Sequence, residues 1–461
     1  MGKRLKLLYI ALTFTAILLP TVCMPVWKET ANSENRRLAS MPSLKKSDGS
    51  LNVDILHELG DYYQDHFAFR SGLVTANSLL STKLFSVSSN DSVIYGKNGW
   101  MYYQDSLDDY LGRHLLDERE IFNIAHSMRL LQDYVEKHKV HFLYVPVPNK
   151  NTLYGDNMPY YDSYKASEEK NILNLYNEMD REGVSYLNMI DVLSGSDETL
   201  YHETDSHWTN MGAAIASDAI LDEIGFPHNE WSKEPYHTKV DFEGDLKNMI
   251  YPAISQPEEE IYFDKQYSYE YVNEIESNFD PKIYTTSEGK PASAVVYRDS
   301  FGNALLPFLA DAFGKAYFSR SIPYRAEDLA SNKANILIIE RAERFLENTA
   351  QNPPLSQGER LESVPEGTAL AYTAEIGKEK EWNDNISYSI NGKYIQIDGY
   401  LNHTEGIPYN SKIYVKFDTG DVYEAFHATI VRDAEKHPYG FRIYIPADDT
   451  ERRSLSVYTG I

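Results

Sequence analysis

The feature that most constrains this chain is an alternation of helix-like and strand-like segments between residues 121 and 339. Apolar residues recur at helical spacing over 121–135 and 172–179, and a further helix is predicted over about 210–224. Short, mostly apolar runs typical of buried strands cover residues 140–147, 184–189, 293–297, 315–319 and 335–339. Strands that alternate with helices predict an α/β fold, with a mainly parallel sheet covered by helices on both faces.

Two patterns precede this region. Residues 54–85 carry an imperfect amphipathic stripe, which predicts a helical segment. Residues 92–103 place aromatic and β-branched runs on both sides of Asn98-Gly99, which predicts a β-hairpin.

A chain of 461 residues is too long for one ordinary hydrophobic core, so we expect it to divide into two or more domains. Within a main domain over 51–350, the acidic, Tyr-rich segment of about 234–290 is predicted to be an insertion of irregular strands. Asn352-Pro353-Pro354 marks a linker over 351–365. Residues 366–461 carry short alternating runs separated by turn residues, which predict a small antiparallel β-sandwich.

The N-terminus carries a membrane signal. Three basic residues, Lys3, Arg4 and Lys6, precede a largely apolar run that extends to Trp27. The length of this run matches the roughly 20 residues that a membrane span requires. The basic flank is expected to stay in the cytoplasm. No Ala-x-Ala-like site follows, so residues 1–27 are predicted to be an uncleaved signal anchor rather than a removed signal peptide. Residues 28–50 are then a polar tether, and the bulk of the chain is extracellular on a single-pass anchor at the cell membrane.

Composition excludes several functions. The single cysteine, Cys23, lies in the apolar run, so disulfides, cysteine nucleophiles and cysteine-ligated zinc are excluded from the exported part. A net charge of -25 argues against nucleic-acid binding, which needs clustered Lys and Arg. The 36 tyrosines suit either a carbohydrate-binding surface or β-rich packing.

A candidate nucleophile follows the strand predicted over 293–297. In Arg298-Asp299-Ser300-Phe301-Gly302 the serine lies between this strand and a predicted helix, so its backbone N–H is unpaired and faces developing negative charge. Gly302 either lets a substrate approach closely or eases the turn. The structural alternative is that Asp299 and Ser300 are helix N-caps.

A candidate base lies in Tyr201-His202-Glu203-Thr204-Asp205-Ser206-His207-Trp208-Thr209. His207 can take the proton of a serine, and Asp205 can hold the far nitrogen of the imidazole. A rival interpretation is a metal site in which His202, Asp205 and His207 supply nitrogen and oxygen ligands, with Glu203 as the nearby fourth ligand. We favour the Ser/His/Asp acyl-transfer site, which needs no metal or organic cofactor.

A third strand end, after residue 147, presents Asn149 and Lys150. Either side chain can donate to an oxyanion or to a bound carboxylate, but for Lys150 we favour loop solvation. Trp208 is interpreted as packing or as a wall that faces the acceptor. All three stretches follow predicted strands of an α/β sheet, where such folds collect their ligands.

Six motifs in order resemble the AlgX/AlgJ-like SGNH proteins, whose Gram-positive relatives are often called DHHW proteins. The resemblance covers roughly residues 30–350. The motifs are Glu34-Asn35-Arg36, Asp65-His66-Phe67-Ala68-Phe69-Arg70, Tyr95-Gly96-Lys97-Asn98-Gly99-Trp100, Pro148-Asn149-Lys150 with Tyr154, Asp205-Ser206-His207-Trp208 and Asp299-Ser300-Phe301-Gly302.

This resemblance implies an SGNH-hydrolase-like three-layer α/β/α domain. It also implies O-acetylation of an exported polysaccharide, with acetyl groups received from a membrane-bound O-acyltransferase. Carried onto this chain, it makes Ser300 the nucleophile, His207 the base and Asp205 its orienter, with Asn149 or the backbone around Gly302 as weaker oxyanion candidates. The chain departs from the pattern at Ser206, where DHHW proteins have a second His, so acceptor binding or local structure is expected to differ there.

The sequence therefore predicts a membrane-anchored, surface-facing enzyme that moves an acyl group, most often acetyl in such proteins, onto a cell-envelope or secreted polysaccharide. Two alternatives stay open. A carbohydrate esterase would use the same triad with water as acceptor, and a non-catalytic glycan-binding or assembly protein would use its tyrosines to hold polymer.

Overall fold

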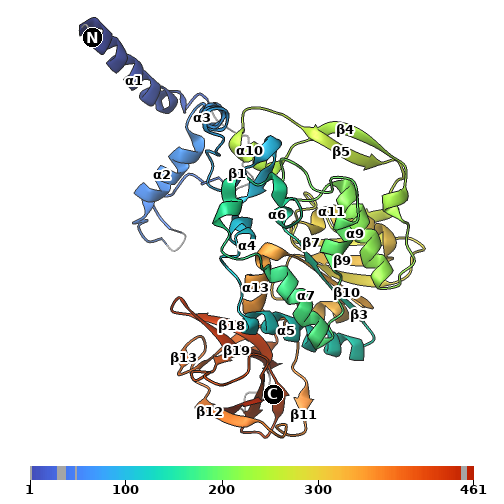
Figure 1. Ribbon diagram of the computed structural model, residues 1–461. Helices are drawn as coiled ribbons and strands as arrows, with labels where there is room; N and C mark the ends of the chain where they lie inside the picture. Colours follow the sequence, from blue (N-terminus) through green and yellow to red (C-terminus); the bar gives the residue numbers. More distant parts are fainter. Residues whose placement is uncertain (1–2, 28–37, 47–48, 448–453, 461) are drawn as a thin grey trace.

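A computed structural model of the chain describes residues 3–27, 38–46, 49–447 and 454–460. Helix α1 (Lys3–Cys23) projects away from the rest of the molecule, at the opposite end from the C-terminal strands (Figure 1). Within it, residues Arg4–Cys23 are long and apolar enough to cross a membrane, by length and composition alone. Much of the predicted tether, residues 28–37 and 47–48, lies outside the described residues.

The segment 54–85 is helical, as predicted, but it is not continuous. The structure has two helices, α2 (Ile55–His66) and α3 (Arg70–Phe85), separated by a short turn. Phe67 is extended and Phe69 has a φ of 65°, a left-handed conformation that a continuous α-helix does not accept. The Nε atom of Arg70 donates to the carbonyl of Gln64 at 2.7 Å, which satisfies an end of α2.

The predicted hairpin forms. Strands β1 (Val93–Tyr95) and β2 (Met101–Tyr103) pair antiparallel. Asn98 and Gly99 both have positive φ, 57° and 89°, as the turn between them requires. Two further short helices are α4 (Leu107–Tyr110), which follows the hairpin in the chain, and α6 (Lys150–Leu153).

A six-stranded sheet forms the centre of the main domain. Its order is β3 (His141–Val147), β10 (Ile336–Ala342), β8 (Ser293–Tyr297), β9 (Lys315–Ser319), β7 (Lys282–Ser287) and β6 (Tyr269–Tyr271). The first four strands are parallel to one another, whereas β7 and β6 are antiparallel to their neighbours. The sheet is therefore mixed and mainly parallel, which confirms the predicted α/β class.

Helices cover both faces of this sheet because its strands are apolar on both sides. Leu143 and Val145 point into one core, which contains residues of α8 (Met189–Ser194), α9 (Asn210–Glu223) and α11 (Gly302–Ala312). Phe142 and Tyr144 point into the other, with α5 (Glu118–Lys137), α7 (Asn171–Glu182), α12 (Glu327–Asn332) and α13 (Leu346–Gln351). This alternation produces the three-layer α/β/α arrangement.

One predicted strand, residues 184–189, does not form. Tyr186 makes a single parallel bridge to Tyr144 at the edge of the sheet. Helix α8 then begins at Met189, because the side chain of Asn188 accepts from the N–H of Asp191 and caps the helix. Pairing with β3 is therefore limited to this bridge before the chain enters α8.

The acidic, Tyr-rich segment contains regular elements. Strands β4 (Tyr236–Phe242) and β5 (Glu258–Phe263) form an antiparallel pair that extends along one side of the domain (Figure 1). Helix α10 (Asp245–Ile250) lies in the connection between them, and β6 and β7 complete the edge of the central sheet.

The C-terminal strands form two five-stranded antiparallel sheets around one core. One sheet has the order β11 (Arg360–Leu361), β17 (Val422–Glu424), β16 (Lys412–Phe417), β20 (Ser454–Gly460) and β12 (Ala369–Glu375). The other has the order β13 (Trp382–Asn383), β14 (Ile386–Asn391), β15 (Tyr394–Tyr400), β19 (Glu435–Pro446) and β18 (Phe426–Arg432). Both sheets contribute side chains to one apolar cluster, so this lobe is the expected β-sandwich.

Helix α5 lies beside the β-sandwich (Figure 1), and buried polar contacts join the two. The Arg119 guanidinium donates to the carbonyls of Tyr409 and Ser411 at 2.8 and 2.6 Å, and lies 2.7 Å from Nδ1 of His427. The segment predicted as a linker is also packed at Leu355, which is buried and bonds through its N–H to Tyr324. The two lobes therefore meet across a specific interface.

Candidate active site

The candidate site lies at the carboxyl edge of the central sheet. Because β3, β10, β8 and β9 are parallel, the segments that follow them gather at one edge. Asn149 and Lys150 follow β3, Ser300 follows β8, and Arg344 follows β10. The loop that carries Asp205 and His207 reaches this edge just before helix α9.

Ser300, His207 and Asp205 form one hydrogen-bonded chain. The Nε2 atom of His207 lies 2.8 Å from Oγ of Ser300, and its Nδ1 atom lies 2.7 Å from Oδ1 of Asp205. The same Oδ1 accepts from the backbone N–H of His207 at 2.9 Å. The other carboxylate oxygen of Asp205 accepts from the N–H of Asp245 at 2.9 Å. The imidazole is therefore held with one nitrogen toward a carboxylate and the other toward a serine, the geometry of a nucleophilic triad.

The electrostatics of the loop depend on two carboxyl groups. Asp205 is buried, and burial alone would raise its pKa, but the charge and hydrogen bond of His207 hold its pKa well below the usual range. Asp245 behaves in the opposite way, because burial and then the negative charge of Asp205 raise its pKa to about 7. Asp205 is therefore the ionised partner of His207 at neutral pH, while Asp245 titrates near neutrality.

Asp299 shapes the turn that presents Ser300. Its Oδ1 accepts from the N–H of Phe301 at 2.9 Å, and its Oδ2 accepts from the N–H of Ala342 at 2.8 Å. Its own N–H donates to the buried carboxyl of Glu340 at 2.9 Å. Burial and the charge of Asp299 raise the pKa of Glu340 well above its ordinary value. Asp299 thus fixes the turn before α11 without being its N-cap, since the N-cap residue is Phe301 and has no side-chain cap bond. Ser300 directs its hydroxyl toward His207.

Gly302 is required by close packing inside the protein. A Cβ atom at this position would lie 2.5 Å from Cβ of Arg298 and 3.0 Å from Oε2 of Glu340. These close contacts account for a glycine at position 302 without the approach of a substrate. Among the described residues, no acceptor is bonded to the N–H groups of Ser300 and Gly302 at the start of α11. These two groups are available to an oxyanion.

Lys150 is a buried clamp and not a solvated loop residue. Its ammonium donates to three backbone carbonyls, those of Met101 at 2.7 Å, Glu203 at 2.8 Å and Asp205 at 3.0 Å. Burial lowers its pKa to about 7, and nearby acids led by Asp205 oppose this effect. With three donors committed to the backbone, Lys150 positions the Asp205 loop against strand β2.

Asn149 is engaged on the side of the site that faces Glu343. Its backbone N–H donates to Oε2 of Glu343 at 2.8 Å, and its Nδ2 atom lies 3.3 Å from Oδ2 of Asp109. Burial raises the pKa of Glu343 to about 7, and Asp109 adds to this effect. An oxyanion role for Asn149 stays a prediction.

The remaining residues of the loop support its shape. Trp208 is buried and its Nε1 donates to the carbonyl of Phe301 at 3.1 Å, so it packs beneath the nucleophile turn. His202 lies 3.0 Å from Oε2 of Glu260 and stacks on Phe242 at 3.6 Å. The predicted metal set is thus not assembled as expected, because His202 faces Glu258 and Glu260. In the described part of the chain, the residue that joins Asp205 and His207 in one cluster of possible metal ligands is Asp245.

Two residues near the site were not predicted from the sequence. Asp245 opens the short helix α10 within the Tyr-rich segment, and only the fold brings it to Asp205. Arg344 follows β10 and lies over the rings of Phe301 and Tyr103, at 5.2 and 5.8 Å from the ring centroids. Its position after the strand ending at Ala342 is a signal that could have identified it.

Residues 93–281 match the family model described as the SGNH hydrolase-like domain of the acetyltransferase AlgX. The chain is also 25% identical over 227 residues to the probable alginate O-acetylase AlgJ of Pseudomonas syringae pv. tomato, covering 48% of this chain and 52% of that relative. It thus spans about half the length of this curated relative. The predicted resemblance to AlgX/AlgJ-like proteins is confirmed. The matched segment includes Asp205, His207 and Asp245 and ends before Ser300.

Two solved structures are similar to part of the chain. A DHHW family protein from Eubacterium siraeum is 19% identical, covers 56% of this chain and 92% of its own, and has a TM-score of 0.42. PatB1 of Bacillus cereus is 15% identical, covers 56% of this chain and 97% of its own, and has a TM-score of 0.45.

Proposed function

We propose that this AlgX/AlgJ-like SGNH protein is an O-acyltransferase that acetylates a cell-envelope or secreted polysaccharide through an acyl-serine intermediate. The observation that carries the proposal is the continuous hydrogen-bonded chain from Ser300 through His207 to Asp205. The match of residues 93–281 to the AlgX acetyltransferase model supports the same reaction class.

The first half-reaction acylates the enzyme. Nε2 of His207 takes the hydroxyl proton of Ser300 as Oγ attacks the carbonyl carbon of an acyl donor. The negative charge that forms on the carbonyl oxygen is stabilised by the N–H groups of Ser300 and Gly302. The bond to the leaving group then breaks, and His207 returns the proton to that group, which leaves an ester on Ser300.

The second half-reaction transfers the acyl group. A glycan hydroxyl gives its proton to Nε2 of His207 and attacks the ester carbonyl. The ester bond to Ser300 breaks, and Oγ regains a proton from His207, which restores the free enzyme. Asp205 holds the imidazole in the required tautomer and stabilises its charged form in both steps.

Membrane attachment through α1 and an acetyl donor in the membrane belong to the same proposal. Helix α1 has the length of a single span, and it lies at the opposite end of the molecule from the β-sandwich (Figure 1). A membrane-bound O-acyltransferase would then supply acetyl groups close to this anchor, on the extracellular side.

The test offers the full chain an activated aryl acetate, with and without oligosaccharide acceptors. The proposal predicts aryl alcohol release by the wild type, loss of this release in Ser300→Ala and His207→Ala, and acetylated oligosaccharide when an acceptor is present. Release that never yields acetylated acceptor would instead indicate the esterase alternative. No release above the two variants would contradict catalysis and leave a glycan-binding protein.

A further inference from the structure

We propose that a polar, tyrosine-walled cavity beside the β1–β2 hairpin binds a neutral segment of the acceptor glycan. This inference rests on the proposed function, because it identifies the substrate class of the same enzyme. The cavity has a volume of about 350 Å³, at the lower end of the roughly 300–1,000 Å³ that small-molecule sites occupy. It is lined by Ser86, Val87, Ser88, Asn90, Asp91, Val93, Ile94, Tyr95, Gln104, Pro159, Tyr160 and Tyr161.

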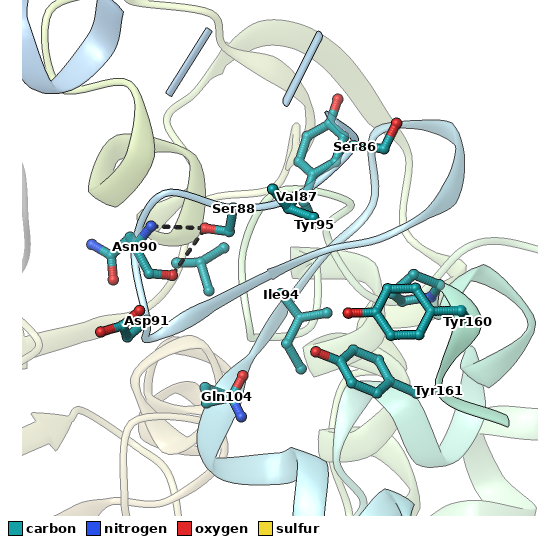
Figure 2. Close-up of a pocket in the computed structure, with 12 residues that line it drawn as sticks. Ser86, Val87, Ser88, Asn90, Asp91, Ile94, Tyr95, Gln104, Tyr160 and Tyr161 are labelled. Atoms are coloured by element: carbon teal, nitrogen blue, oxygen red, sulfur yellow. Dashed lines mark hydrogen bonds between the residues drawn. The ribbon is translucent and has the colours of Figure 1, made fainter. Parts of the chain in front are cut away.

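Aromatic side chains form one wall of this cavity. Figure 2 shows Tyr160 and Tyr161 together on one side, with their hydroxyls directed toward Ile94. Their ring centroids lie 4.7 Å apart, and Tyr160 is 60% exposed. An exposed phenol offers a flat apolar face and a polar tip, which suits the C–H face and the hydroxyl edge of a sugar ring.

Polar groups on the other walls are free for a ligand. Ser88 and Asn90 already bond to each other and to the backbone, which fixes the loop after α3. By contrast, the side chains of Asp91 and Gln104 have no hydrogen-bond partner among the described residues. A carboxylate and an amide at the rim can accept from and donate to adjacent sugar hydroxyls.

The charge of the lining selects against a polyanion. Asp91 is the one charged residue among the twelve that line the cavity, so no Lys or Arg is among these twelve. A uronate carboxylate or a phosphate would meet a negative charge here, on a chain whose net charge is -25. A hydroxyl-rich, uncharged saccharide is the ligand that this chemistry fits.

The cavity is connected to the proposed catalytic loop through the hairpin. Tyr95 of the lining pairs with Met101, whose N–H donates to the carbonyl of Glu203 and whose carbonyl accepts from Lys150. Two strand spacings, roughly 10 Å, therefore separate the cavity wall from the loop that carries Asp205. A second connection runs from Nδ2 of Asn90 to the carbonyl of Met249 on α10, the helix that begins at Asp245. One glycan chain can contact both places.

The test measures binding of a panel of neutral and anionic oligosaccharides to the full chain by titration calorimetry. The neutral members are hexose and N-acetylhexosamine oligomers, and the anionic members are oligouronates. The Ser300→Ala chain is used, so that capture is measured without chemistry. We expect at least one neutral oligomer to bind, and Tyr160→Ala and Gln104→Leu each to weaken it about fivefold or more.

Tyr164→Ala is the matched control, because Tyr164 lies in the same short helix and is 56% exposed but does not line the cavity. It is expected to bind as Ser300→Ala alone does, and thermal unfolding checks that all variants fold. The inference is overturned if no neutral oligomer binds, if oligouronates bind as well, or if Tyr164→Ala loses as much affinity as Tyr160→Ala. Failure of the proposed function is separate, since it would appear as absence of acyl-Ser300 in the wild type without any glycan.

Discussion

Nε2 of His207 lies 2.8 Å from Oγ of Ser300, although 93 residues separate them in the chain. Their approach depends on the parallel sheet, because Ser300 follows β8 while the loop of His207 is fixed to the end of β3 through Lys150. The nucleophile and the base thus come from different segments that share one edge of the sheet.

Replacing Lys150 with Met is expected to disturb both stability and catalysis. Three buried carbonyls, including that of Asp205, would lose their donor, and the free energy of unfolding should fall by about 3 kcal/mol or more. Urea unfolding measures this change, and aryl acetate turnover should fall with it because the Asp205 loop shifts. Lys97→Met is the control, since exposed Lys97 donates to a single carbonyl. Equal stability of the two variants would contradict the clamp.

Asp245 is expected to set a pH dependence of the acylation rate. Its pKa is raised to about 7, first by burial and then by the charge of Asp205. Above this pH the ionised carboxylate adds negative charge beside His207, which strengthens the imidazole as a base, so the wild-type rate should show an inflection near pH 7. Asp245→Asn should remove that inflection, while Asp241→Asn on the neighbouring strand β4 should keep it. An unchanged profile in Asp245→Asn would count against this role.

His202 is expected to make stability fall at alkaline pH. Burial opposes its protonation, but Glu258 and Glu260 outweigh burial and raise its pKa to about 9. The folded pKa lies above the unfolded value, so the stabilisation is full below about pH 6.5 and is lost as pH rises through about 9. Compared with His202→Gln, the wild type should lose about 3 kcal/mol of unfolding free energy between pH 6 and pH 10. A difference independent of pH would refute the ion pair.

Arg119 is expected to hold the two lobes together. It is buried at the contact between α5 and the β-sandwich, and burial lowers its pKa to about 9. Arg119→Met leaves the carbonyls of Tyr409 and Ser411 without a donor, so calorimetry should show a lower unfolding temperature and separate transitions for the lobes. Lys137 lies on the same helix and forms an exposed ion pair with Glu359, so Lys137→Ala should change the free energy of unfolding by less than about 1 kcal/mol. One unchanged transition in Arg119→Met would argue against coupling.

Local patterns were sufficient to predict much of the architecture. The strands at 293–297 and 315–319 were predicted with their observed bounds, since buried parallel strands are continuous apolar runs. The segment 184–189 was mispredicted as a strand, because an N-cap at Asn188 interrupts an otherwise favourable pattern. The helical segment 54–85 was predicted without the break that left-handed Phe69 introduces. Such interruptions depend on contacts that periodicity does not report.

The candidate site was predictable only in part. Asp205 and His207 were predicted from an acid and an imidazole clustered in one short stretch, and Ser300 from its position after a strand. The fold brings the three residues together. Lys150 was misinterpreted because solvation is the ordinary fate of a loop lysine, and its burial depends on Met101 and the 201–209 loop closing over it. Asp245 was missed because its approach to Asp205 is entirely tertiary.

The measurement that tests the central claim most directly is the site of acylation. The full chain is mixed with an activated aryl acetate, quenched in acid during turnover and digested, and the peptides are analysed by mass spectrometry. One added acetyl group is expected on Ser300 of the wild type. None is expected at this position in Ser300→Ala or, because acylation needs the imidazole as a base, in His207→Ala. An unmodified Ser300 during active turnover, or acetyl on another residue that turns over at the catalytic rate, would contradict the central claim.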